Sequence, residues 1–173
     1  MEPILHILIP LLILLALFPK LDKRLVVGLS LLAILPDFDF FIPPLHRVIT
    51  HNVFFALIIS LIIYAIWNNI KIFYISLYYL LTHLILDLTI GAVALFYPFY
   101  KRLIEINISL STNWVPTINI RTYELSKVLE YTGPHYFFTK VSVMVLLILI
   151  VMLVIKYRKK LFNYKWVSFF VNR

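Results

Sequence analysis

The sequence predicts an all-α integral membrane bundle of about five transmembrane helices, with a small amphipathic β-hairpin and short helix between the fourth and fifth spans. Of its 173 residues, 62% are hydrophobic and 14% are charged, and the mean hydropathy is +0.96. A soluble domain is about half apolar and about a quarter charged, so this composition indicates a membrane protein. Separate apolar runs along the chain predict the individual spans.

The apolar runs are 4–18, 25–42, 53–67, 70–99 and 141–155. A membrane helix needs about 17–25 residues, so the fourth run is long enough to tilt or break, and three of the others are slightly short. Pro10 and Pro36 lie inside runs, where membrane helices tolerate proline if neighbouring groups satisfy the freed carbonyls. Pro43 and Pro44 end the second run.

The positions of the cations predict the topology. Basic residues follow the first run at 20–24 and the last run at 156–165, which favours a cytoplasmic location for both segments. The N-terminus, the 43–52 loop and the 100–140 segment would then lie outside. Cations clustered at span ends also argue against a nucleic-acid partner, despite the formal charge of +8. We therefore expect residues 1–173 to form a single polytopic domain in the cell membrane.

The 100–140 segment differs from the rest of the chain. Isoleucine or leucine alternates with polar residues over 104–111, and the alternation resumes at 118–120 after a turn. This period of two predicts an amphipathic hairpin at the membrane interface, followed by a short helix over 123–131. Such a hairpin could cover a site in the bundle as a lid.

Several ionisable side chains lie in or beside the apolar runs. They are His6, Asp37, Asp39, His46, His51, His83 and Asp87. A carboxylate at the bilayer centre costs about 2.5–3.5 kcal/mol, so each aspartate requires compensation. Carboxylates and imidazoles together are typical ligands of a divalent metal, and the absence of cysteine excludes thiolate ligands.

The alternation of the spans brings these residues toward one membrane face. His6 begins the first run, Asp37 and Asp39 end the second, and His51 precedes the third. Along the fourth run, a rise of 1.5 Å per residue puts the last two candidates about 18 and 24 Å above Lys71, in a core about 30 Å thick. All candidates therefore converge on the half of the bundle predicted to face outward.

Each motif also has a structural interpretation. His83 and Asp87 are four residues apart on one helix face, which suits either two ligands of one metal or a buried hydrogen-bonded pair. Asp37 and Asp39 share a side only in an extended or irregular stretch, which predicts that the chain unwinds at the end of the second run; alternatively, they begin a solvated loop. His6 could simply be interfacial.

The segment from His46 to Asn52 holds two imidazoles, a guanidinium, a hydroxyl and an amide. Arg47 could balance the aspartates or bind an anionic substrate oxygen with two hydrogen bonds. Alternatively, it could contact lipid headgroups.

Over residues 1–100, Pro-Asp-x-Asp, His-Arg-x-x-Thr-His and His-x-x-x-Asp together resemble the YdjM-like family of membrane-bound metal-dependent hydrolases. The residues that match the family motifs are His6, Asp37, Asp39, His46, Arg47, Thr50, His51, His83 and Asp87. Val48 stands where the family usually has glycine, Asn52 where it has serine, and Phe40 where many members have histidine. The missing histidine leaves open whether one or two ions bind.

From these residues we expect a metal-dependent hydrolase that uses Zn²⁺, or Mn²⁺ or Fe²⁺, with Arg47 stabilising developing negative charge. A membrane lipid or lipid-linked molecule, such as a phosphoester, is the expected substrate. Two alternatives remain open: a divalent-cation or proton transporter, and a non-catalytic scaffold locked by its polar cluster. The sequence does not specify the oligomeric state.

Overall fold

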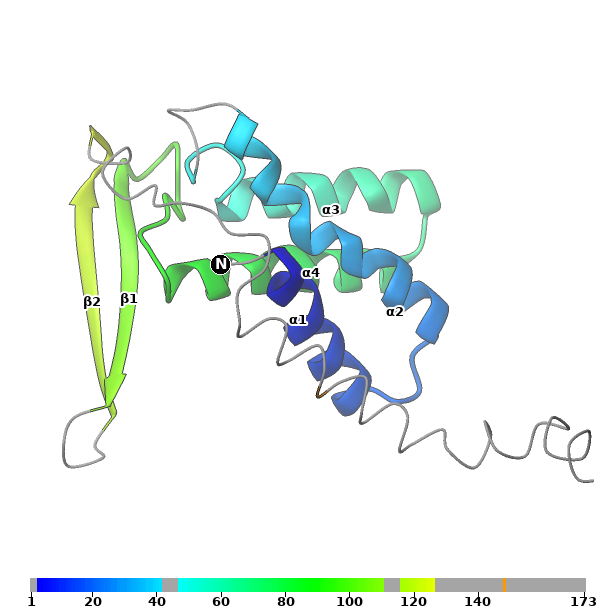
Figure 1. Cartoon of the computed structure of the whole chain (residues 1–173). Helices are drawn as coiled ribbons and strands as arrows, with labels where there is room; N and C mark the ends of the chain where they lie inside the picture. Colours follow the sequence, from blue (N-terminus) through cyan, green and yellow to red (C-terminus); the bar gives the residue numbers. More distant parts are fainter. Residues whose placement is uncertain (1–2, 42–46, 111–115, 127–147, 149–173) are drawn as a thin grey trace, which may run out of the picture. The chain divides into compact units, whose positions relative to one another are not determined.

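The computed structural model describes residues 3–41, 47–110, 116–126 and 148, and these contain four α-helices, one 3₁₀ helix and two strands (Figure 1). The helices are α1 (Pro3–Leu17), α2 (Lys23–Leu29), η1 (the 3₁₀ helix, Ser30–Phe41), α3 (Val53–Trp67) and α4 (Ile70–Leu88). The strands are β1 (Arg102–Leu110) and β2 (Pro116–Glu124). The chain divides into two units, Met1–His135 and Tyr136–Arg173, and every named element belongs to the first.

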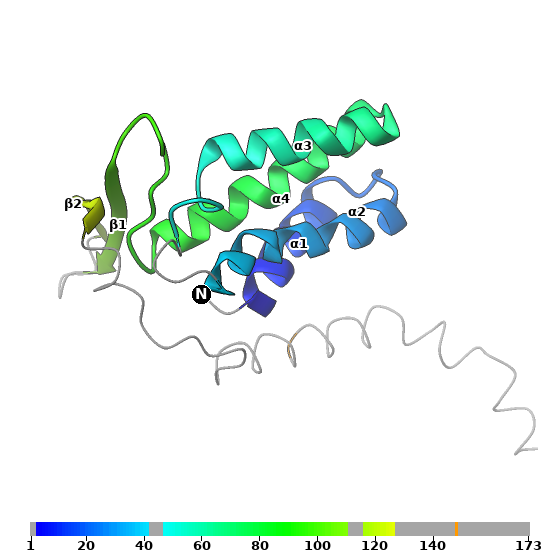
Figure 2. The same ribbon diagram turned by 90° about the horizontal axis from the view of Figure 1, so that it is seen from above.

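Helices α3 and α4 form an antiparallel pair (Figures 1 and 2). Asn68 ends α3 in the left-handed conformation at φ 47°, and its backbone N–H donates to Tyr64 O at 2.7 Å. Asparagine tolerates this conformation better than most residues, so the chain can reverse within two residues. Asn69 then caps α4, accepting a hydrogen bond from Lys71 N at 2.9 Å. The short connection forces α3 and α4 to lie side by side.

An apolar core joins α1, α2, η1 and α4. Its buried members are Leu14, Val26, Ala33, Ile75 and Tyr79. Tyr79 donates its hydroxyl to Val26 O at 2.9 Å, and Tyr78 donates to Pro10 O at 3.0 Å. Both tyrosine hydroxyls therefore satisfy backbone carbonyls of neighbouring helices, which fixes the helices relative to α4.

The predicted set of about five membrane-spanning helices is wrong. Within the described ranges, α4 (19 residues) alone is long and apolar enough to cross a bilayer. Helices α1 and α3 have 15 residues each, a length of about 22 Å against a hydrocarbon core of about 30 Å. The second apolar run divides into the seven-residue α2 and the 3₁₀ helix η1, which contains Pro36. The predicted fifth run, 141–155, lies outside the described residues apart from residue 148.

The prediction that the bundle is all-α is also wrong, because β1 and β2 pair as an antiparallel sheet, although a hairpin was expected there. Opposite residues include Ile106 with Ile120 and Glu105 with Arg121, so apolar and polar residues alternate as predicted. β2 extends through Glu124, and residues 127–131 of the predicted short helix lie outside the described residues.

The hairpin is joined to the helices at its base. Ile104 in β1 exchanges two backbone hydrogen bonds with Val93, of 2.8 and 2.9 Å. Leu103 packs with Val48, Ala92 and nearby residues in a second apolar cluster. In Figures 1 and 2 the hairpin lies beyond the C-terminal end of α4 and runs across the direction of that helix. The chain between α4 and β1 therefore connects the polar end of α4 to the sheet.

Candidate metal centre

The C-terminal end of α4 presents His83 and Asp87 on one face, because residues four apart are neighbours on a helix. His83 Nε2 lies 3.6 Å from Asp87 Oδ2, and both side chains are buried. α4 packs against α1, η1 and α3. A rigid helix therefore fixes two donor groups in the interior.

Helix η1 sends its two aspartates in different directions, whereas the extended or irregular stretch expected from the sequence would put them on one side. A 3₁₀ helix turns about 120° per residue, so residues two apart point to different sides. Asp37 faces His83, with Oδ1 3.5 Å from His83 Nε2. Asp39 instead lies beside the other side of His51, where its Oδ2 is 3.0 Å from His51 Nδ1. The carboxylates of Asp37 and Asp39 therefore lie on different sides of the His51 ring.

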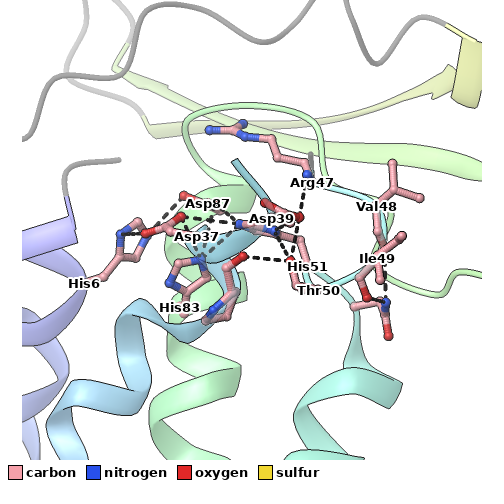
Figure 3. Close-up of polar contacts among 12 residues, drawn as sticks. His6, Asp37, Asp39, Arg47, Val48, Ile49, Thr50, His51, His83 and Asp87 are labelled. Carbon is pink, nitrogen blue, oxygen red and sulfur yellow. Dashed lines mark hydrogen bonds and ion pairs between the residues drawn. The ribbon is translucent and has the colours of Figure 1, made fainter. Parts of the chain in front are cut away.

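His51 lies in the short segment before α3. Asn52 caps α3 by accepting a hydrogen bond from Phe55 N at 2.8 Å, and its amide donates to Val48 O at 3.1 Å. The adjacent Thr50 hydroxyl donates to Asp39 Oδ2 at 2.5 Å. These bonds fix the backbone on both sides of His51, whose ring points into the cluster (Figure 3).

Asp37, His51, His83 and Asp87 each offer one donor atom, and these four atoms lie within 4.8 Å of one another (Figure 3). His51 Nε2 is 3.1 Å from His83 Nε2, 3.1 Å from Asp87 Oδ2 and 3.6 Å from Asp37 Oδ1. The donors of a tetrahedral zinc ion are about 3.3 Å apart, given metal–donor distances near 2.0–2.1 Å. The spacing therefore fits one divalent ion held by two imidazoles and two carboxylates.

Both imidazoles are turned so that Nε2 faces the other donors. His83 Nδ1 lies 2.6 Å from Ala33 O, and it must donate because a carbonyl oxygen only accepts. His51 Nδ1 makes the equivalent contact with the Asp39 carboxylate. A hydrogen bond at Nδ1 leaves the lone pair on Nε2, which is the form that binds a metal.

Asp39 is itself held in place by the 47–52 segment. Its Oδ2 accepts hydrogen bonds from Arg47 N at 3.0 Å and from Thr50 Oγ1, in addition to the contact with His51. The side chain is 2% exposed. The structure thus puts Asp39 behind His51, in a position to orient the ring, and on the far side of that ring from the four donor atoms.

The carboxylates also determine the charge of His51 in the absence of a metal. Burial lowers the pKa of His51, but hydrogen bonds to Asp37, Asp39 and Asp87 raise it by more, so the pKa reaches about 10. The protonated ring then offsets part of the negative charge around it. A divalent ion would compete with that proton for the same carboxylates.

His6 comes from α1 and lies on the other side of His83 from His51 (Figure 3). The two rings are stacked with centroids 4.0 Å apart. His6 Nε2 is 3.1 Å from Asp87 Oδ1, and the side chain is fully buried. Four elements of the chain therefore contribute ionisable groups to one cluster.

Arg47 is held in an uncommon backbone conformation at the edge of this cluster, with φ 64°. This region costs most residues about 1–2 kcal/mol. Hydrogen bonds from Arg47 N to Asp39 Oδ2 and from Ala94 N to Arg47 O, at 3.0 and 3.1 Å, hold it there. The side chain is buried, and its Nε has no hydrogen-bond partner among the described residues.

Gly91 makes room for the Arg47 guanidinium. A Cβ atom at residue 91 would lie 2.2 Å from Arg47 Nη1, well inside van der Waals contact. In Figure 3 the guanidinium extends beyond the network of dashed contacts that joins the aspartates and histidines. Gly91 therefore determines where a buried cation sits next to the cluster.

A family model described as YdjM inner membrane protein matches residues 1–161. The chain belongs to this family. No curated protein and no solved structure gave a match. Membership of the YdjM inner membrane family supports a cell membrane location, and it confirms the family resemblance seen in the sequence motifs.

Most of the predicted site residues in this YdjM-family chain meet in one place, and His46 lies outside the described residues. The sequence did not reveal the role of Gly91, whose importance depends on a side chain far away in the sequence. The structure also shows that Asn52 caps α3 and that the Thr50 hydroxyl bonds to Asp39. A hydroxyl next to a candidate ligand was the available signal for Thr50.

Proposed function

We propose that this protein is a membrane-bound metal-dependent hydrolase that acts on a phosphoester or another lipid-linked substrate. The observation that supports this most is the spacing of the donor atoms of Asp37, His51, His83 and Asp87, which suits a divalent ion. A donor set of two imidazoles and two carboxylates, without sulfur, admits Zn²⁺, Mn²⁺ or Fe²⁺. When bound, such an ion would supply Lewis acidity toward water and the bond to be cleaved.

The exposure of the cluster favours a reaction with a substrate over a purely structural ion. The Asp37 side chain is 21% exposed, whereas those of His6, His51 and Asp87 are exposed by 1% or less. A substrate would therefore approach from the side of Asp37. Phe38, the next residue in η1, is 60% exposed, and an exposed apolar ring adjacent in the chain to Asp37 suits the hydrocarbon part of a lipid.

Arg47 is the residue we propose for binding negative charge on the substrate. Its guanidinium is buried beside the cluster, with no ion pair to a carboxylate among the described residues. A guanidinium matches two oxygens of a phosphate group and stabilises charge that develops during hydrolysis. The basic residues that follow the first and last apolar runs, at 20–24 and 156–165, favour a position of the site toward the outer half of the bilayer.

Hydrolysis should be measured with full-length protein in detergent and phospholipids labelled in the headgroup. We expect headgroup release that stops after removal of metal by a chelator and returns when Zn²⁺ or Mn²⁺ is added. His83→Ala should lack this activity, and Ser76→Ala, a buried change on the same helix, should keep it. Release that is unaffected by the chelator would contradict the proposal. Absence of release, together with metal flux into proteoliposomes, would instead favour a transporter.

A further inference from the structure

Asp37 and Asp87 each divide their two oxygens between different histidines. Asp37 Oδ1 is 3.6 Å from His51 Nε2, and Asp87 Oδ2 is 3.1 Å from the same atom. The other oxygens turn toward His6: Asp87 Oδ1 is 3.1 Å from its Nε2, and Asp37 Oδ2 is 3.8 Å from its Nδ1. Both carboxylates thus present one oxygen to each side of the centre (Figure 3).

Three buried polar atoms on the His6 side have no hydrogen-bond partner among the described residues. They are His6 Nδ1, His6 Nε2 and Asp37 Oδ2. His6 Nε2 is close to Asp87 Oδ1, but the contact does not have the geometry of a hydrogen bond. A buried imidazole with neither nitrogen bonded is costly, and so it calls for a ligand at that position.

We propose that His6, Asp37 and Asp87 bind a second divalent cation next to the first, with both carboxylates bridging the two ions. This inference rests on the proposed function, because it requires an ion at the first position. Three protein ligands would leave coordination positions for water or substrate, as in catalytic metal sites. Two ions bridged in this way are typically about 3.5–4 Å apart, a distance suited to phosphoester cleavage.

The number of bound ions determines the net charge of the cluster. With neutral histidines, one divalent cation and the buried Arg47 guanidinium together balance the charges of Asp37, Asp39 and Asp87. A second divalent cation would make the centre positive toward its exposed side at Asp37. A positive centre would attract an anionic phosphoester substrate.

The test is Mn²⁺ binding to full-length, metal-depleted protein in detergent, followed by elemental analysis and electron paramagnetic resonance. We expect two Mn²⁺ per chain in the wild type, with a spectrum of two magnetically coupled ions. His6→Phe keeps the stacking on His83 but has no donor atom, so it should bind one Mn²⁺ with an uncoupled spectrum. Ser76→Ala, a buried polar residue outside the cluster, should bind two.

Three results would overturn the second position. One Mn²⁺ per chain in both the wild type and His6→Phe would reject it, while metal-dependent hydrolysis would leave the proposed function intact. Two coupled ions in His6→Phe would show that His6 is not a ligand. No Mn²⁺ in the wild type, confirmed by failure of Zn²⁺ to bind, would reject both the second position and the proposed function.

Discussion

The cluster of buried aspartates and histidines and the β-hairpin both contain carboxylates, but they accommodate the charge in different ways. In the hairpin, Glu105 faces Arg121 across the strands and accepts a hydrogen bond from the Tyr123 hydroxyl at 2.6 Å. These partners come from a short stretch of chain near solvent. In the cluster, Asp37 and Asp87 are surrounded by imidazoles from distant elements.

This difference in burial indicates which charged side chains are candidates for function. Opposite charges that face each other near solvent, such as those of Glu105 and Arg121, contribute about 0–1 kcal/mol, because water already solvates both groups. A buried carboxylate is costly unless a cation or hydrogen-bond donors compensate it. Asp87 is buried at the end of α4 despite that cost, which is expected of a binding centre rather than of a structural contact.

Of the substitutions in the two regions, Asp87→Asn in the cluster should cause the largest loss of metal affinity. The amide keeps the shape of the side chain but is a much poorer metal ligand, so we expect Zn²⁺ affinity to fall by more than about 100-fold. Zinc competition with a chromophoric chelator would measure this. Glu105→Gln makes the same chemical change in the hairpin and should leave the affinity unchanged. Equal losses in both variants would remove the distinction between the two regions.

A smaller loss is expected from Asp39→Asn. This change weakens the hydrogen bond that orients His51 without removing any of the four donor atoms, and such changes cost about 10–100-fold in metal affinity. The same zinc competition applies. Asp22→Asn is a matched control, since Asp22 caps α2 away from the cluster. A loss as large as that of Asp87→Asn would instead identify Asp39 as a direct ligand.

Gly91→Ala should separate catalysis from metal binding. The new methyl group would displace the Arg47 guanidinium, and misplacing a catalytic group by about 1 Å can cost about 100-fold in rate. We expect headgroup release to fall about 10–100-fold while the metal content stays the same. Gly28→Ala is the control, because a Cβ there meets no atom within 4 Å. Unchanged hydrolysis in Gly91→Ala would argue against a role for Arg47.

The smallest effect should follow from breaking the hairpin pair. Arg121→Gln removes the charge opposite Glu105. The free energy of unfolding, measured by thermal denaturation, should change by no more than about 0–1 kcal/mol, the value of an exposed ion pair. Metal content should not change. A loss of bound metal in this variant would mean that the hairpin supports the centre directly.

The sequence predicted local features best. The four-residue spacing of His83 and Asp87 and the alternation in the hairpin follow from helix and strand periodicity, which are properties of neighbouring residues. Helix lengths were not predicted, because the second apolar run is divided between α2 and η1. The 3₁₀ geometry of η1 also puts Asp37 and Asp39 on different sides, which the sequence did not reveal. The role of Gly91 depends on its tertiary contact with Arg47, and the sequence pattern does not predict such a contact.

The most direct test of the metal centre is elemental analysis of the full-length protein, purified without chelators, beside Asp87→Ala. We predict at least about one divalent ion per wild-type chain and almost none in the variant, because removing a carboxylate opens the set of four donor atoms. Less than about one ion per two wild-type chains, or equal metal in both proteins, would contradict the proposal that these side chains bind an ion.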